Sequence, residues 1–267
     1  MRKQVLCIRW GTKYGPDYVN RLYGMVARHV TPPFTFHCMT DDPAGLRPEV
    51  AVLPLPELGC ERPTNTHGVW GKSRLWRPDI GLEGPVLFID LDVVVTGSLD
   101  GFFEVGGEDD VILARNPNTP FERLGQTSIF RFPVGKLAPL RERFLADPQG
   151  VADRYRFEQR FVTRNVPGGV TFWPRGWVAL YKWHCVPVFP LNLVRPPRLP
   201  PGTRVVLFAG TLNPPDAIAG RWSPRQPVRT PREHLAAAWA REGRGPLARQ
   251  LRQYVLPAPW VAEHWRE

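Results

Sequence analysis

The amino-acid sequence predicts an α/β fold with a mixed, mostly parallel central sheet that is flanked by helices. Its first 55 residues alternate between strand, helix, strand and strand patterns, which is typical of such a sheet. Residues 86–89 form a short apolar run after Gly84-Pro85 and predict a strand that is buried on both faces. The 267 residues, of which 43% are hydrophobic, are enough to enclose a sizeable core.

The first half of the chain supplies these elements in order. Apolar residues at Val19, Leu22, Tyr23, Val26 and Val30 follow the spacing of one helix face and predict a helix over residues 17–30. The strands expected around it cover residues 4–9, 34–39 and 50–53. A short helix is expected at residues 70–76 and a helical turn at 98–103.

The second half adds shorter strands and a helical end. Strands are predicted at residues 111–114, 127–132, 170–173 and 204–208. Residues 177–183 are expected to form a strand or an extended loop, and residues 137–145 and 151–161 are amphipathic segments. Thr230 and Glu233 have capping-box spacing and open a helix that Gly243 ends, and a last helix covers 246–255. We expect one domain over residues 1–220, and a small C-terminal helical appendage over 221–267 packed on it.

Cysteine, histidine and hydropathy patterns exclude several classes of protein. The four cysteines are widely scattered, which favours reduced thiols, and the six histidines lack zinc-ligand spacing. No apolar run approaches the ~20 residues that span a bilayer, and the N-terminus does not resemble a signal peptide. We therefore expect a cytoplasmic protein.

The charge is strongly positive. The net charge is +10, and residues 221–252 contain eight arginines against two acidic residues. This surface favours anionic partners, including peripheral contact with an anionic membrane at its inner face; a solvated basic face is the alternative. No zinc-finger or RRM signature is present, so we expect no nucleic-acid partner.

Two acidic residues follow the predicted buried strand. In a strand, residues two apart point to the same side, so Asp90 and Asp92 are expected to project together near the carboxyl end of a central strand. Two such carboxylates repel each other, and Mg²⁺ or Mn²⁺ would neutralise both. In the structural alternative, one aspartate caps the next turn and the other pairs with an arginine.

Four stretches, in this order, resemble glycosyltransferase family 8, the group that includes glycogenin and bacterial lipopolysaccharide galactosyltransferases. They are CIRWGTKYGPDYVNRLYGMVARH with FTFHCMTDD, then GVWGKSRLW, GPVLFIDLDVVVTGSLDGFF and RVVLFAGTLNPPD. The likeness spans residues 4–216. It implies the Rossmann-like GT-A fold and a transferase that moves a hexose from a nucleoside-diphosphate sugar, with UDP as the expected nucleotide, to a hydroxyl group. Retention of configuration and assistance by Mn²⁺ or Mg²⁺ are also implied.

The resemblance also implies residue roles. Asp90 and Asp92 would bind the ribose and the metal, and Lys72 would reach the diphosphate. The other residues implied to contact the nucleotide are Trp10, Gly11, Thr12, Tyr14, Asp41, Gly210 and Asn213. Lys72 has the alternative of being a solvated surface lysine.

Two further segments would line the sugar. Gln126, Thr127 and Ser128 occupy the place of the family's Asn-Ser-Ser segment, and Glu158 lies where the family has an acidic residue near the reacting carbon. Gln126, Ser128 and Glu158 are the candidate catalytic residues. Alternatively, Gln126 and Ser128 cap a strand, and Glu158 pairs with Arg154 or Arg156.

The last motif departs from the family pattern Phe-His-Gly-x-x-Lys-Pro, because Ala209 and Asn213 replace its histidine and lysine. An alanine cannot bind a metal and an asparagine carries no charge; losing one such stabilising group typically costs about 3–4 kcal/mol of transition-state energy. Either the metal is held by two aspartates, diphosphate and water, or an arginine replaces the lysine, or the protein is a catalytically weakened relative.

Two hypotheses follow. The first is a hexosyltransferase that uses a UDP-sugar and a glycan or lipid-linked acceptor in polysaccharide biosynthesis. The second is a weakened relative that binds a nucleotide sugar or a glycan in a glycan-assembly complex.

Overall fold

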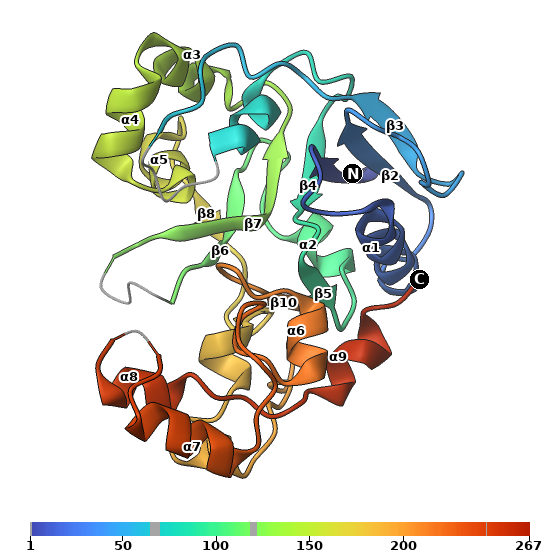
Figure 1. Cartoon of the computed structure of the whole chain (residues 1–267). Helices are drawn as coiled ribbons and strands as arrows, with labels where there is room; N and C mark the ends of the chain where they lie inside the picture. Colours follow the sequence, from blue (N-terminus) through green and yellow to red (C-terminus); the bar gives the residue numbers. More distant parts are fainter. Residues whose placement is uncertain (1, 65–69, 118–121, 244) are drawn as a thin grey trace. The chain divides into compact units, whose positions relative to one another are not determined.

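The computed structural model describes residues 2–64, 70–117, 122–243 and 245–267, which divide into two compact units (Figure 1). Unit 1 comprises Met1–Leu91 and Ser98–Arg175, and unit 2 comprises Asp92–Gly97 and Gly176–Glu267. These units describe packing alone, so the expected functional division at residue 220 stays a prediction.

The central sheet of unit 1 has seven strands in the order β3-β2-β1-β4-β7-β6-β8. The strands are β1 (Lys3–Arg9), β2 (Phe34–Thr40), β3 (Ala51–Pro54), β4 (Pro85–Ile89), β6 (Ile112–Arg115), β7 (Gly125–Pro133) and β8 (Thr171–Phe172). Neighbours pair in parallel except β4 with β7 and β6 with β7, which are antiparallel. The mixed, mostly parallel sheet is confirmed, and β4 is its middle strand.

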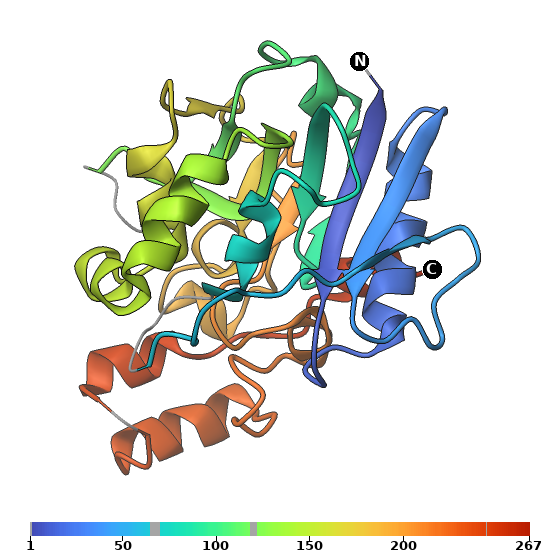
Figure 2. The ribbon, with the colours of Figure 1, turned by 90° about the horizontal axis from the view of Figure 1, so that it is seen from above.

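One face of this sheet packs against α1 (Pro16–His29), whose buried side chains follow the expected helical spacing. The ring of Tyr23 on α1 meets Phe36 on β2 edge-on, with 5.6 Å between centroids. Cys7 and Cys38 are partners in the β1–β2 register, and both are buried free thiols, as expected. Figure 2 shows α1 on the opposite side of the strands from α3–α5.

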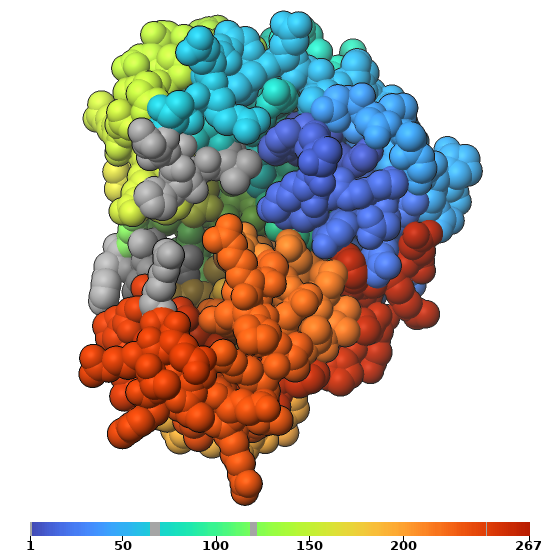
Figure 3. Space-filling view, in the orientation of Figure 1, coloured from blue at the N-terminus to red at the C-terminus, as the bar shows by residue number. Residues whose placement is uncertain are grey.

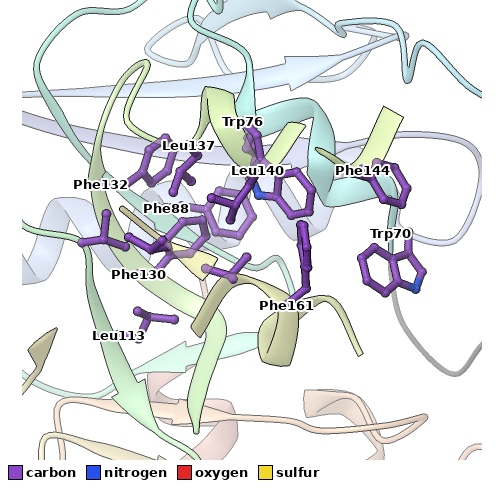
Figure 4. Close-up of a cluster of buried hydrophobic side chains, with 14 of the residues drawn as sticks. Trp70, Trp76, Phe88, Leu113, Phe130, Phe132, Leu137, Leu140, Phe144 and Phe161 are labelled. Carbon is purple, nitrogen blue, oxygen red and sulfur yellow. The ribbon is translucent and has the colours of Figure 1, made fainter. Parts of the chain in front are cut away.

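The other face carries the main aromatic core, which Figure 4 shows. It packs against the 3₁₀ turn η1 (Trp70–Trp76) and the helices α3 (Ala138–Ala146), α4 (Pro148–Tyr155) and α5 (Glu158–Asn165). Phe144 stacks on Trp70 at 5.2 Å and meets Trp76 edge-on at 5.8 Å. This packing fixes η1 and α5, which carry two of the predicted site residues.

Two helices, rather than one, cover the amphipathic segment at residues 151–161. Arg156 has a φ of 63°, in the left-handed region, so α4 ends before it and α5 starts at Glu158. The turn expected at 98–103 is the short helix α2 (Asp100–Glu104).

The segment with the two aspartates is not one continuous strand. β4 ends at Ile89, residues 91–92 form a turn, and β5 (Val93–Val95) joins the three-stranded sheet β5-β10-β9 of unit 2. Because residues 91–92 form a turn, strand alternation does not place Asp90 and Asp92 on the same side, and that they project together stays a prediction.

Unit 2 contains this sheet, with β9 (Val178–Leu180) and β10 (Val205–Leu207), and several short helices. They are the π-helical turn η2 (Tyr181–Cys185), the 3₁₀ turn η3 (Leu191–Leu193), α6 (Pro214–Ala219), α7 (Pro231–Trp239), α8 (Leu247–Arg252) and α9 (Pro259–His264). The Thr230–Glu233 capping box is confirmed; α6 and α9, which pack together, were not predicted. Figure 3 shows the residues that follow position 220 in orange and red. In the part of the chain that is described, no helix combines the length and apolar character needed to cross a bilayer.

Candidate functional site

A charged cluster lies at the carboxyl end of β4. The backbone N–H of Asp90 donates to the Ser128 carbonyl at 2.8 Å, which continues the β4–β7 ladder by one residue. Lys72 on η1 places its Nζ 2.6 Å from Asp90 Oδ2 and 3.3 Å from the Thr127 carbonyl oxygen. Because Lys72 is buried, the alternative of a solvated surface lysine is wrong.

Glu158 completes the cluster from the start of α5. Its side chain is only 4% exposed, and its Oε2 accepts a 2.7 Å hydrogen bond from the Thr127 hydroxyl. Its Oε1 is buried and accepts no hydrogen bond from any described residue. The alternative that Glu158 pairs with Arg154 or Arg156 is therefore wrong. We call Lys72, Asp90, Thr127 and Glu158 the charged cluster.

The protonation of Glu158 depends on this surrounding. The pKa of Glu158 is raised to about 7, mainly because burial removes water from the charged form. The charge of Asp90 also raises this pKa, whereas the charge of Lys72 and the hydrogen bond from Thr127 partly offset the increase. A buried carboxyl group with a pKa near neutrality beside a lysine and a second carboxylate is typical of functional sites.

A second group of predicted residues meets where β1 and β2 end. Gly11, at a φ of +62°, donates its N–H to Asp41 Oδ2 at 3.2 Å. Arg9 holds this loop by donating to the carbonyl oxygens of Tyr14, at 3.1 Å, and Asp42. Thr12 lies exposed in the same loop.

Trp10 links this loop to the charged cluster. A Cβ on Gly71 would lie 3.1 Å from the Trp10 indole, so the ring packs directly against η1. The Arg74 guanidinium lies 5.9 Å from the Trp10 ring centroid. Gly71 and Arg74 of η1 therefore face Trp10 in the predicted nucleotide loop, while Lys72 reaches Asp90.

The structure also places the residues expected to bind the sugar. Gln126 and Ser128 lie on β7 on either side of Thr127. The pairing with β6 shifts there, because Leu113 pairs with Phe130 and the next residue, Ala114, pairs with Gln126, which leaves residues 127–129 of β7 as the extra ones. Gln126 is a buried residue, 7% exposed. Neither residue ends the strand, which continues to Pro133, so the alternative of a strand cap is wrong.

Three predicted residues belong to unit 2. Asp92, Gly210 and Asn213 lie outside the unit that holds the charged cluster, and their part in the site stays a prediction. Asn213 begins α6, where its N–H donates to Asp216 Oδ2 at 3.1 Å. Asn213 also caps α6 with its side chain, which accepts from the backbone N–H of Asp216 in a capping box; a lysine side chain cannot accept this bond, which gives a structural reason for an asparagine where the family has lysine.

Sequence reasoning missed two positioning residues. Thr127 had been assigned only to the sugar pocket, whereas its hydroxyl orients Glu158 and its carbonyl accepts from Lys72. Arg9 was interpreted only as the end of a strand. A charged residue that ends an apolar strand and is 7% exposed needs buried partners, and the run VLCIR carried that signal.

The donor chemistry fits a hard divalent cation. Asp90 Oδ2 is engaged by Lys72, while Oδ1 accepts no hydrogen bond from a described residue. Carboxylate oxygens are the ligands that Mg²⁺ and Mn²⁺ prefer. Within the described residues, no group of three or more His, Cys, Asp or Glu side chains is placed to hold a metal.

Solved structures resemble this chain, although no model of a protein family and no curated protein matches its sequence. The galactosyltransferase LgtC in complex with donor and acceptor sugar analogues is 13% identical, with a TM-score of 0.57 over 97% of this chain and 99% of its own. The glycosyltransferase GlyE of Streptococcus pneumoniae is 12% identical, with a TM-score of 0.55 over 100% of this chain and 66% of its own. At such low identity the likeness shows the fold alone. The chain has the GT-A fold, which its resemblance to glycosyltransferase family 8 implies.

Proposed function

We propose that this protein is a hexosyltransferase that takes its sugar from a nucleoside-diphosphate donor, with UDP as the nucleotide, and passes it to a hydroxyl acceptor with retention. The observation that carries the proposal is the charged cluster at the end of the middle strand of a GT-A sheet. Open α/β sheets bind their ligands at the carboxyl ends of their strands.

Lys72 supplies positive charge for the leaving group. A nucleoside diphosphate leaves as a polyanion, and a fixed cation in a water-poor site stabilises that developing charge. The ion pair with Asp90 holds the Lys72 ammonium in place before the donor binds. We propose that the donor diphosphate then shares this ammonium with Asp90.

Glu158 supplies a carboxyl group to the sugar. Its Oε2 is held by Thr127, which leaves Oε1 for a sugar hydroxyl or for the positive charge that develops at the reacting carbon. With a pKa of about 7, roughly half of the Glu158 side chains are ionised at neutral pH in the free protein. Gln126 and Ser128 flank Thr127 and are proposed to contact the same sugar.

Asp90 and Asp92 are proposed to hold Mn²⁺ or Mg²⁺. The ion would neutralise diphosphate charge as a Lewis acid when the donor binds. With Ala209 in place of the family's histidine, the remaining ligands in this proposal are diphosphate oxygens and water, which Mg²⁺ readily retains.

The nucleotide is proposed to occupy the loop at the ends of β1 and β2. Trp10 offers an indole for stacking, Gly11 brings backbone close to the ligand, and Asp41 is a hydroxyl acceptor for ribose. Thr12 and Tyr14 complete this contact, and Gly210 and Asn213 are proposed to reach the diphosphate.

The acceptor is proposed to be a glycan or a lipid-linked precursor of a polysaccharide. A cytoplasmic location, with the arginine-rich C-terminus in contact with an anionic membrane, stays a prediction. No nucleic-acid partner is proposed.

The decisive test combines calorimetric titration of UDP with donor turnover. Wild type, Lys72→Met and Asp92→Asn are titrated with UDP, with and without Mn²⁺, and UDP release from a panel of UDP-sugars is measured. Wild type should bind UDP at micromolar concentration with Mn²⁺, and both variants should bind at least tenfold more weakly. Glu49→Gln, at an exposed glutamate of unit 1 that pairs with Arg47, is the matched control and should bind like wild type.

Each other result has a definite meaning. UDP binding that ignores both Mn²⁺ and Asp92 would overturn the metal assignment. Binding without any turnover would favour the second hypothesis, a weakened relative that binds nucleotide sugars. A lack of UDP binding in wild type would refute the uridine assignment.

A further inference from the structure

A short stretch of unit 2 exposes an unusual number of large apolar side chains. Trp183 is 62% exposed, Val188 76% and Val194 72%, and Phe189 and Leu191 are also exposed. These five lie within twelve residues of sequence, from Trp183 inside η2 to Val194, which directly follows η3. Single exposed apolar residues are ordinary, but a concentration of them marks an interaction surface. We call residues 183–198 the apolar loop; Figure 1 draws it in gold.

The apolar loop is held in a defined conformation. Its base closes where the Arg198 N–H donates to the Cys185 carbonyl at 2.9 Å. Asn192, 1% exposed, donates from its side chain to the Tyr254 carbonyl at 3.0 Å, and the Trp260 indole N–H donates to the Pro197 carbonyl at 3.1 Å. The amide of Asn192 thus points inward, whereas five large apolar side chains of the loop are exposed.

The surroundings of the loop are basic. No Asp or Glu occurs from residue 159 to 215, and unit 2 contains thirteen Lys and Arg residues against six acidic ones. Arg195 and Arg198 in the loop are exposed. Asn192 also lies 3.5 Å from the Leu251 carbonyl, which brings α8 and its exposed Arg249 and Arg252 next to the loop.

We propose that the apolar loop inserts into the interfacial region of an anionic lipid bilayer. Apolar side chains gain free energy by leaving water, and arginines beside them attract anionic headgroups. Tryptophan is favoured at that depth, because its ring is apolar and its N–H is polar. A protein partner presents both signs of charge, whereas apolar side chains flanked by Arg195, Arg198, Arg249 and Arg252 complement a uniformly anionic surface. The inference does not depend on the proposed transferase activity.

The test is flotation with vesicles of phosphatidylcholine alone or with 30% phosphatidylglycerol. Wild type should float with the anionic vesicles only. Val188→Ser/Val194→Ser should weaken binding about tenfold per valine, and Arg195→Gln/Arg198→Gln about fivefold per arginine. The controls are Val52→Ser, on an exposed valine of β3, and Arg62→Gln/Arg154→Gln, on exposed arginines of unit 1; both should bind nearly as wild type.

A second measurement separates insertion from surface attraction. An environment-sensitive dye on Val188→Cys should shift to the blue with anionic vesicles, while the same dye on Val52→Cys should not. Thermal melting of every variant verifies that it is folded. The inference is overturned if folded wild type does not bind anionic vesicles at low salt, or if the double-serine variant binds as well as wild type. It is equally overturned if light scattering shows a lipid-free dimer that this variant dissociates, since the loop would then bind a second copy.

Discussion

Glu158 should make the stability of this protein fall as pH rises toward neutrality. Its folded-state pKa of about 7 lies above the ordinary 4.5, so the folded protein binds the proton more tightly than the unfolded chain does. By linkage, the stabilising contribution of this group is fully present below pH 4.5 and is lost as pH rises through 7. A difference of about 2.5 pKa units corresponds to roughly 3 kcal/mol between pH 4 and pH 8.

The substitution Glu158→Gln removes this titration and keeps the size of the side chain. Urea denaturation of wild type and variant from pH 4 to pH 8 gives the difference in their unfolding free energies. Subtraction cancels the other groups that titrate in this range, such as His37 and His234, whose pKa values are lowered by burial. We expect the difference to move by about 3 kcal/mol in favour of the variant as pH rises.

Glu122→Gln is the control, because the pKa of Glu122 is lowered by folding whereas the pKa of Glu158 is raised. Hydrogen bonds from Arg160 and the charge of Arg164 lower the pKa of Glu122, so its contribution is lost only as pH falls below 4.5. The difference between wild type and this variant should stay constant from pH 5 to pH 8. If Glu158→Gln gives an equally flat difference, Glu158 titrates normally and our account of the cluster is refuted.

Three further substitutions test the supports of the site. Lys72→Met leaves Asp90 without its cation in a mostly buried place and should lower the unfolding free energy by about 3 kcal/mol, measured with urea, while shifting the Glu158 titration upward. Arg131→Met removes donors to the carbonyl oxygens of Phe102, Phe103 and Gly107 in a fully buried position and should cost about 3 kcal/mol in the same assay; a cost below 1 kcal/mol would contradict it. Phe144→Ala should cost about 3–5 kcal/mol, because its ring fills the space between Trp70 and Trp76; a smaller loss would mean that this core collapses around the gap.

Local patterns predicted much of the fold. Helical spacing defined α1, alternation and apolar runs located β1, β2, β4 and β7, and the Thr230–Glu233 spacing placed the start of α7. These features were predictable because periodicity and capping depend on residues a few positions apart. Where one residue adopts an unusual backbone, as Arg156 does between α4 and α5, the same patterns misplaced the boundary.

The sequence by itself predicted an α/β chain with a buried central strand that is followed by an aspartate, and it indicated Lys72, Asp90 and Glu158 as candidate site residues. Only the tertiary structure decided how they act together, because Lys72 and Asp90 are 18 residues apart and Thr127 and Glu158 are 31 apart. The pKa of Glu158 also depends on the tertiary structure, because its burial and the charges near it are set by the elements packed around it. The turn after Asp90 likewise occurs because β4 and β5 belong to different sheets. The local sequence VLFIDLDVVV does not show this, because sheet membership depends on strands that are distant in the sequence.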